Sequence, residues 1–338
     1  MTDTAFVSGA SGYIAGFLIR QLMTEGWTVR TTVRSLAGEA ALRQRLAVDD
    51  RRLHLFAADL TADAGWAEAM AGCRVAAHVA SPLPVGVPKN ANELIVPARD
   101  GALRALRAAR TAGVQRFVMT SSVAAIAYGR GRGVHHFTEA DWTLLDRPGI
   151  TPYVQSKTIA ERAARDWVER EGGNMEFCTI NPSVVLGPVW SRDYSASVLI
   201  VQKLLDGSLR ACPDIGFGVV DVRDVADLHM RALTTPGLAG ERFIASGRFM
   251  KLREIADALR AELGPQASRV TTRDVPDWAV RIAALFSPLA RAVLGELGSV
   301  RHQDASHAKA VLGWQTRPVE QSIADAARSL IALGVVAA

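Results

Sequence analysis

A glycine-rich turn near the start of the chain constrains the fold more than any other feature. The segment GASGYIAG (residues 9–16) follows TAFVSG (residues 4–9), an apolar run that predicts a short buried strand. Residues 13–25 read as a helix that Gly26 ends. A strand that enters a helix through a turn of small residues is typical of the first unit of a parallel nucleotide-binding sheet.

Strand and helix patterns then alternate, which indicates a parallel sheet with helices on both faces. Further strands are expected at TVRTTVRS, LHLFAADL, RVAAHVAS, RFVMTSSVAAIA, MEFCTINPS and ERFIAS, and GFGVVDVRDVADLHMRAL reads as a strand–helix pair. We predict an α/β protein with a Rossmann-type doubly wound sheet and a smaller, mostly helical C-terminal lobe. The nucleotide-binding domain is expected at 1–188 plus about 217–247, and the substrate lobe at about 189–216 plus 248–338.

Composition limits the classes of partner. The 338 residues are 49% hydrophobic, which suffices for a large core, and the net charge is +5. Basic residues are mostly single arginines on helical stretches, so we expect no nucleic-acid partner, although the positive bias favours a phosphorylated ligand. No apolar run is long enough for a membrane span, and no leader precedes the first strand. The cysteines, which are Cys73, Cys178 and Cys212, form no disulfide or zinc pattern, so a cytoplasmic location is expected.

The glycines of the turn suit a bound pyrophosphate. Gly9 permits the tight turn, and Gly12 lets the backbone approach a phosphate at the helix N-terminus. Ala15 fills the third small position. The spacing is Gly-x-x-Gly-x-x-Ala, which differs from the Gly-x-Gly-x-x-Gly pattern, and Tyr13 inside the turn looks exposed.

The second strand indicates which dinucleotide binds. An acidic residue about twenty positions after the turn usually binds the ribose of NAD. Here the strand ends with Arg34, whose guanidinium suits the 2′-phosphate of NADP. Arg30 is interpreted as structural, and Arg43 is a second candidate for a phosphate contact. We therefore predict NADP or NADPH as the cofactor.

A tyrosine and a lysine share one face of a predicted helix. In TPYVQSK, Tyr153 and Lys157 are four residues apart, so both can point into one cleft. A neighbouring ammonium lowers the pKa of a phenol, which would make Tyr153 an acid or base near neutral pH. Ser122, after the strand FVMT, could hold the substrate oxygen. We predict Ser122, Tyr153 and Lys157 as the catalytic residues.

Other polar or aromatic residues are given more ordinary interpretations. The pair His135–His136 lacks a third ligand at suitable spacing, so we expect no metal. Asp221 and Asp224 look like a pair of helix N-caps. The remaining candidates are Asn181, expected to bind backbone or water, and Trp142 and Trp190, which either line a substrate pocket or pack.

Together these motifs resemble the extended short-chain dehydrogenases/reductases over nearly the whole chain. The similarity is greatest to the branch of dihydroflavonol reductases, cinnamoyl-CoA reductases and microbial aldehyde/ketone reductases. It is carried by GASGYIAG, TVRTTVRS, AADLT, HVASP, FVMTSS, PYVQSK, INPSVVLGP, VVDVRDVA and AKAVLGW. Two departures are Ala15 at a position that is usually glycine and Val123-Ala124 after the serine pair, which leaves the substrate neighbourhood open.

The resemblance implies an NADPH-dependent carbonyl reductase that converts aldehydes or ketones to alcohols reversibly. It implies that Tyr153 donates the proton, that Lys157 lowers the pKa of Tyr153 and holds the nicotinamide ribose, and that Ser122 positions the carbonyl oxygen. Cofactor contacts are then expected at Gly9, Ser11, Gly12, Tyr13, Ile14, Arg34, Asp59, Leu60, Ala80, Ser81, Tyr153, Lys157, Pro182, Ser183 and Val185. Relatives in this family include monomers and homodimers.

Three alternatives stay open at this point. A hydroxysteroid-type dehydrogenase would share every catalytic residue. A sugar-nucleotide epimerase or dehydratase would retain NAD, against which Arg34 argues. A non-catalytic dinucleotide-sensing regulator would be expected to lack the Tyr153–Lys157 pair.

Overall fold

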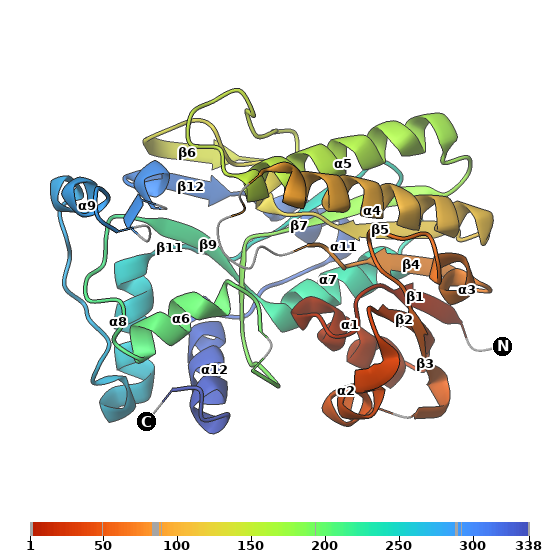
Figure 1. Cartoon of the computed structure of the whole chain (residues 1–338), viewed down its shortest axis with the longest axis horizontal. Helices are drawn as coiled ribbons and strands as arrows, with labels where there is room; N and C mark the ends of the chain where they lie inside the picture. Colours follow the sequence, from red (N-terminus) through yellow and green to blue (C-terminus); the bar gives the residue numbers. More distant parts are fainter. Residues whose placement is uncertain are drawn as a thin grey trace.

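A seven-stranded parallel sheet forms the larger part of the molecule (Figure 1). The computed structural model describes residues 3–48, 50–82, 88, 90–192, 194–287, 290–291 and 293–336. The strand order is β10-β7-β5-β4-β1-β2-β3, and every neighbouring pair is parallel. The strands are β1 (Thr4–Val7), β2 (Thr28–Val33), β3 (Leu53–Ala57), β4 (Val75–His78), β5 (Arg116–Thr120), β7 (Glu176–Pro182) and β10 (Arg242–Ala245). The chain reverses direction across the sheet between β1 and β4, so the predicted Rossmann-type sheet is confirmed.

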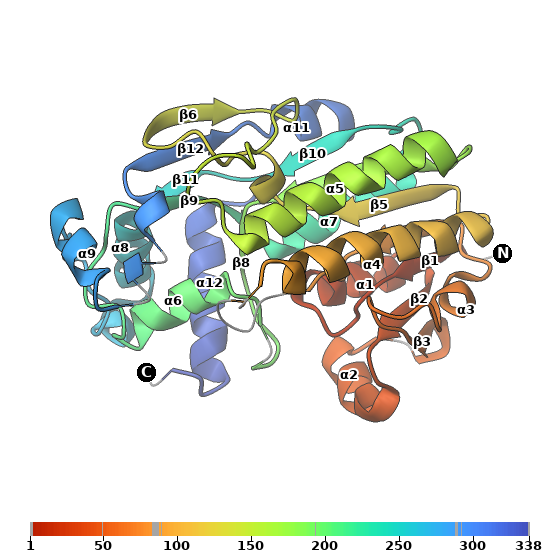
Figure 2. The same ribbon diagram turned by 45° about the horizontal axis from the view of Figure 1, so that its top comes forward.

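Helices cover both faces of this sheet, as Figure 2 shows. On one face lie α1 (Tyr13–Thr24), α7 (Val222–Thr234) and α11 (Ser306–Leu312). On the other lie α3 (Trp66–Met70), α4 (Asn92–Thr111) and α5 (Pro152–Glu171). Because both faces are covered by helices, the central strands are largely buried, as in β4, where all four residues are buried.

The strand predicted at RFVMTSSVAAIA is shorter than expected. β5 stops at Thr120, and Val123–Ala125 form a short 3₁₀ turn. The Ser122 hydroxyl accepts a hydrogen bond from the Ala124 amide at 3.1 Å, which caps that turn. The side chain of Ser122 is therefore held at the point where the strand ends.

The smaller lobe contains strands as well as the expected helices. Its helices are α6 (Val198–Leu205), α8 (Leu252–Leu263), α9 (Asp277–Ala283) and α12 (Val319–Ala332). Two small sheets accompany them: β11 (Phe249–Lys251), β9 (Gly216–Asp221) and β8 (Val184–Leu186) in one, and β12 (Ser299–Gln303) with β6 (Gly133–Phe137) in the other. A separate apolar core of α6, α8 and α12 side chains supports the lobe.

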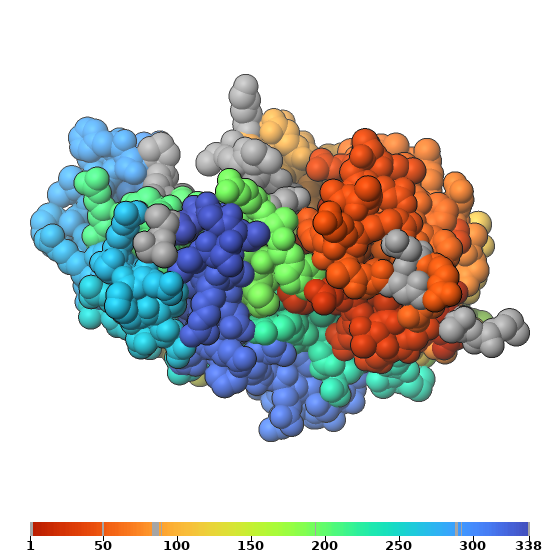
Figure 3. All heavy atoms as spheres, turned by 90° about the horizontal axis from the view of Figure 1, so that it is seen from below, coloured from red at the N-terminus to blue at the C-terminus, as the bar shows by residue number. Residues whose placement is uncertain are grey.

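The chain passes between the two parts more than once. After β7 it enters the lobe through β8 and α6, returns through α7 and β10 to the large sheet, and leaves again at β11. Figure 3 shows the N-terminal residues in red and orange on one side, the C-terminal residues in blue on the other, and green residues between them. A further short helix, α2 (Glu39–Leu46), lies beyond β2, at the cofactor side.

Candidate active site

The expected site residues follow strand ends at one edge of the large sheet. Gly9 follows β1, Ala80 follows β4, Ser122 follows β5, and Pro182 ends β7. Parallel strands place their carboxyl ends at the same edge, and β1 and β4 flank the point where the strand order reverses. The fold therefore gathers segments far apart in the sequence around one crevice.

The glycine turn has the backbone that its sequence predicts. Gly9 has φ +75°, a left-handed conformation that favours glycine, and a Cβ on Gly9 would lie 3.0 Å from the Cβ of Ala80. The N-cap of α1 is Gly12, which offers no side-chain oxygen to the first amides of the helix. These free N–H groups and the positive end of the helix dipole fit a pyrophosphate.

Arginines line a cavity beside this turn. The cavity measures about 960 Å³, and its lining includes Ser11, Arg20, Arg34, Ser35, Arg45, Trp190 and Ser191. Arg34 follows β2 and is exposed, and within the described part of the chain it has no hydrogen bond or ion pair. An exposed guanidinium without a hydrogen bond or ion pair to the described residues fits a phosphate group.

The other two arginines considered from the sequence are engaged elsewhere. Arg30 donates to the carbonyls of Glu68 and Ala69 and lies 4.3 Å from the Phe56 ring centre, so its structural interpretation is confirmed. Arg43 pairs with Glu39 and donates to the Leu53 carbonyl. The sequence analysis missed Arg45, which lies two residues further along α2.

Arg45 joins the glycine turn to the segment after β8. Its guanidinium donates to the carbonyl of Ser11 and to the hydroxyl of Ser191, each at 3.1 Å. Beside this bridge, Trp190 packs against Phe17, with ring centres 3.8 Å apart and ring planes tilted by 30°. Of the two interpretations of Trp190, packing is therefore observed, and the same residue also lines the cavity.

Asp59 and Leu60, which were expected to border the adenine, lie shortly after β3. The Asp59 carboxylate accepts hydrogen bonds from the amide and hydroxyl of Thr61 at 2.8 and 2.5 Å, and these bonds lower its pKa. Leu60 packs so closely on α4 that a Cβ at Gly101 would lie 2.7 Å from Leu60 Cδ2. Their cofactor role stays a prediction.

A buried serine sets the path of the chain after β4. The Ser8 hydroxyl accepts hydrogen bonds from the amides of Val79 and Ala80 at 2.9 Å each, and it lies 3.1 Å from Nδ1 of His78. Burial, with a further contribution from the Lys157 ammonium, lowers the pKa of His78 to about 3. The neutral His78 and Ser8 thus fix Ala80 beside Gly9, and Ser81 follows directly.

The three predicted catalytic residues lie at this same edge of the sheet. Tyr153 and Lys157 lie on the first turns of α5, where the Thr151 hydroxyl caps the helix by accepting from the Val154 amide. The Ser122 side chain lies close enough to Tyr153 to lower the pKa of that phenol. Lys157 is 7% exposed and close enough to His78 on β4 to influence its pKa.

The pKa of Tyr153 differs from the expectation. We expected the lysine to lower it, but burial raises the pKa of Tyr153 above its usual value, and the Ser122 hydrogen bond only partly opposes this. Burial also lowers the pKa of Lys157 to about 8, while the Glu161 carboxylate acts in the opposite direction. Tyr153 therefore carries its proton at neutral pH, as a proton donor must.

Two orphaned polar atoms lie among the expected cofactor residues. The Ser183 hydroxyl, after β7, and the Tyr13 hydroxyl are buried and have no hydrogen-bond partner within the described residues. Tyr13 is thus not exposed as expected, and it packs against the cores of both parts of the molecule. Val185 is buried in β8 opposite Val220. Buried hydroxyls without a partner are uncommon in folded proteins, so both are candidates for a contact with a bound polar group.

Sequence analysis missed a buried ionic cluster directly behind the catalytic residues. Glu161 lies four residues after Lys157 on α5 and is completely buried. It accepts from Ser121, Arg242 and the amide of Asn181. Asn181 also donates to the backbone carbonyl of Ser122 at 3.1 Å, which confirms the expected backbone role. The continuing four-residue spacing from Tyr153 was the available sign.

Asp221, Asp224 and Trp142 differ in how well they match the expectations from the sequence. Asp221 caps α7 by accepting from the Arg223 amide, as expected. Asp224 was wrongly expected to be a cap; it instead binds the backbone amide and guanidinium of Arg317, 93 residues away. Trp142 packs against Arg242, whose guanidinium lies 4.0 Å from its ring centre.

The histidines and the long helices bear on metal binding and on membrane insertion. In the described ranges, no three histidine, cysteine or acidic side chains come together as metal ligands, and His136 stacks on His302 with ring centres 4.9 Å apart. None of the helices within those ranges has the length and apolar character needed to span a bilayer.

Comparisons with known proteins agree with this geometry. The model of the NAD-dependent epimerase/dehydratase family matches residues 5–244. The chain is 36% identical over 260 residues to a cinnamoyl-CoA reductase of Medicago truncatula, covering 74% of this chain and 76% of that protein. It is 32% identical over 298 residues to a Candida albicans protein provisionally named an NADPH-dependent methylglyoxal reductase. The matched part covers 81% of this chain and 86% of that protein. Yeast methylglyoxal/isovaleraldehyde reductase Gre2, solved with NADPH, has the same fold, with a TM-score of 0.80 and 23% sequence identity. The match covers 98% of this chain and 99% of that chain.

Proposed function

The chain belongs to the NAD-dependent epimerase/dehydratase family, and on this premise we propose that it is an NADPH-dependent carbonyl reductase. The observations that carry the proposal are the side chain of Ser122 beside Tyr153, Lys157 one turn further along α5, and Arg34 in the lining of the cavity beside the glycine turn. The reaction interconverts an aldehyde or ketone and the corresponding alcohol.

The relatives agree on the coarser part of this statement. Both sequence relatives are reductases by name, and the Candida albicans name includes NADPH. The expectation of an NADP-dependent oxidoreductase that acts on C=O or CH–OH groups is confirmed at this level. The first-turn amides of α1, the guanidinium of Arg34 and the unpaired hydroxyl of Ser183 would hold the pyrophosphate, the 2′-phosphate and the nicotinamide amide respectively.

The chain's own residues then supply placement and the proton. NADPH, when bound, supplies the hydride. The hydroxyls of Ser122 and Tyr153 would hold the carbonyl oxygen from two sides, and Tyr153 would protonate that oxygen as negative charge develops on it. The ammonium of Lys157 favours the phenolate that Tyr153 becomes. The high pKa of Tyr153 keeps the proton in place until the substrate oxygen takes it.

Two features support this proposal over the alternatives. The uncommitted Arg34 in place of an acidic residue favours NADP over the NAD of a sugar-nucleotide epimerase. The intact Tyr153–Lys157 pair on α5 favours an enzyme over a dinucleotide-sensing regulator. A hydroxysteroid-type dehydrogenase uses the same residues, so the substrate decides between the two reductase classes.

The proposed partner is a small carbonyl or alcohol. We also place the protein in the cytoplasm, because its three cysteines, Cys73, Cys178 and Cys212, are all buried as free thiols.

The test measures NADPH consumption at 340 nm with aldehydes, ketones, a steroid ketone and an aromatic acyl-CoA, with NADH in parallel. Turnover with NADPH well above that with NADH is expected, and the best substrate names the class. Activity with NADH alone, or NADPH binding without turnover in either direction, would overturn the proposal.

A further inference from the structure

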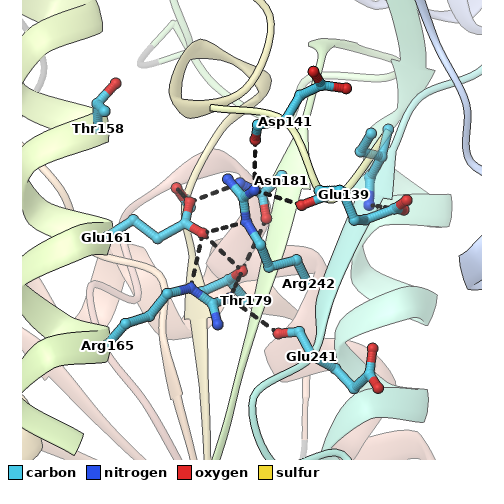
Figure 4. Close-up of polar contacts among 12 residues, drawn as sticks. Glu139, Asp141, Thr158, Glu161, Arg165, Thr179, Asn181, Glu241 and Arg242 are labelled. Carbon is cyan, nitrogen blue, oxygen red and sulfur yellow. Dashed lines mark hydrogen bonds and ion pairs between the residues drawn. The ribbon is translucent and has the colours of Figure 1, made fainter. Parts of the chain in front are cut away.

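Behind the catalytic side chains lies a completely buried carboxylate that the proposed reaction does not use directly. Glu161 is 0% exposed and lies on α5, one turn after Lys157 and two turns after Tyr153. Its two oxygens accept hydrogen bonds from five side chains, which are those of Ser121, Arg165, Thr179, Asn181 and Arg242. Figure 4 shows Glu161 and Arg165 extending from α5 toward Thr179, Asn181 and Arg242. A buried ion of this kind is costly unless it is fully paired.

One oxygen of Glu161 is directed to the strands that carry the site. Oε2 accepts from the hydroxyl of Ser121 at 2.5 Å and from the amide nitrogen of Asn181 at 2.8 Å. Ser121 is the direct neighbour of Ser122, and the Asn181 amide also donates to the carbonyl of Ser122 at 3.1 Å. Through two short connections, Glu161 therefore fixes the backbone of Ser122, whose side chain lies beside Tyr153.

The other oxygen balances one buried and one partly buried cation. Oε1 accepts from Arg242 on β10 at 2.7 Å and from Arg165 on α5 at 3.2 Å. Arg242 also donates to the carbonyls of Glu139 and Asp141 at 2.5 and 2.7 Å, which attaches the loop before α5. The cluster thus joins α5, β5, β7 and β10.

Lys157 lies within the electrostatic field of this cluster. The charged or titratable groups that act on Lys157 are Glu161 on its own helix and His78 from β4, with Tyr153 one turn away. Burial makes His78 neutral, and its pKa is about 3. Glu161 is therefore the one carboxylate among these groups, and it favours the ammonium form of Lys157.

We propose that Glu161 is a positioning residue of the reductase site, which holds Ser122 through Ser121 and Asn181 and keeps Lys157 protonated. This inference rests on the proposed function for its kinetic meaning, whereas its electrostatic part concerns the folded protein alone. A purely structural ion pair would stabilise the sheet without changing the lysine or the proton-transfer step.

The first test therefore does not depend on activity. The chain has five lysines, so ¹⁵N-lysine NMR can follow each ammonium with pH, and Lys157→Met identifies the Lys157 signal. Glu161→Gln keeps the shape of the side chain but removes its charge and leaves Arg165 and Arg242 uncompensated. The Lys157 titration should move down by about one pH unit or more. An unchanged titration in folded Glu161→Gln would overturn the electrostatic part.

The kinetic test uses the same variant beside a matched control. Glu161→Gln should lower kcat more than it changes the KM for NADPH and should move the alkaline limb of the reductive pH profile to lower pH. Glu176→Gln is the control, because Glu176 pairs with Arg116 across β7 and β5 at 2.7 Å, at the opposite end of these strands. It should lose stability but keep the wild-type kcat and pH limb.

A smaller change covers the case in which Glu161→Gln does not fold. Ser121→Ala removes only the hydroxyl that donates to Glu161, and it should lower kcat several-fold with little change in KM. A wild-type kcat in this variant would overturn the positional part. If wild-type protein shows no turnover, or if Tyr153→Phe retains it, the proposed function fails, and the lysine titration still decides the inference about Glu161.

Discussion

The hydroxyl of Thr120 lies 2.7 Å from Nε2 of the completely buried His229, at the end of β5 that leads into the active site. The other ring nitrogen, Nδ1, lies 2.8 Å from the carbonyl of Val225. Because a carbonyl only accepts, Nδ1 carries the proton and Nε2 accepts from Thr120. The imidazole is therefore held neutral between α7 and the sheet.

This arrangement predicts acid sensitivity. Burial lowers the pKa of His229 to about 4, whereas an unfolded histidine titrates near 6.5. Between these values the unfolded chain binds a proton that the native protein does not, so stability is lost as the pH falls below about 6.5. In His229→Leu, the difference in unfolding free energy between pH 7 and pH 5 should shrink by about 2 kcal/mol.

Urea unfolding at both pH values measures this difference. The exposed His54 on β3 provides the matched control, and His54→Leu should keep the wild-type difference. An equal loss of stability on acidification in wild type and His229→Leu would contradict the prediction.

Arg34 should decide cofactor choice. Arg34→Gln removes a charge-assisted contact, so the KM for NADPH should rise on the order of 10- to 100-fold while that for NADH changes little. Steady-state kinetics with both cofactors measures the ratio. Arg30→Gln, on the same strand, should alter stability but leave the ratio unchanged, and the idea is wrong if both variants behave alike.

Tyr153 should be essential for turnover. Tyr153→Phe removes the proton donor, so kcat should fall by at least about 100-fold. Tyr194→Phe is a matched loss of one hydroxyl, since Tyr194 bonds only to Gln202 in the lobe, at 2.7 Å, among the described residues. Circular dichroism checks the folding of both variants. Intact turnover in folded Tyr153→Phe would sink the mechanism.

The reductive rate should decline in mildly alkaline solution. Burial lowers the pKa of Lys157 to about 8, so the ammonium that favours the Tyr153 phenolate is lost as the pH rises through this value. A pH profile of kcat/KM for the carbonyl substrate reports this group in the form of the enzyme that binds that substrate. The profile should fall above about pH 8, and a flat profile to pH 9.5 would show that Lys157 does not control the step.

Sequence alone predicted the parts of the site that depend on local spacing. The turn at Gly9 and Gly12 needs a particular backbone that few residues permit, and its position after a strand makes it recognisable. The pair Tyr153 and Lys157 follows from helical periodicity. In each of these two features, the residues that matter lie within four positions of one another in the sequence.

Interactions between distant segments could not be predicted in the same way. Glu161 and Arg242 are 81 residues apart, and Asp224 and Arg317 are 93 apart. β12 pairs with β6 although Ser299 and Gly133 are remote in the sequence. One amino-acid sequence does not indicate which distant charged residue neutralises a buried carboxylate. These partners are therefore identified only in the three-dimensional structure.

The strand β10 has a practical consequence for protein engineering. It completes the outer edge of the large sheet beside β7, yet it comes from sequence that lies after the first part of the lobe. A lobe graft with a single junction, or a truncation after residue 188, would strip β7 of its neighbour and discard Arg242. Chimeras that exchange substrate specificity must therefore keep residues 222–245 from the recipient and place one junction on each side of them. The lobe is discontinuous in the sequence and cannot be exchanged as one continuous segment.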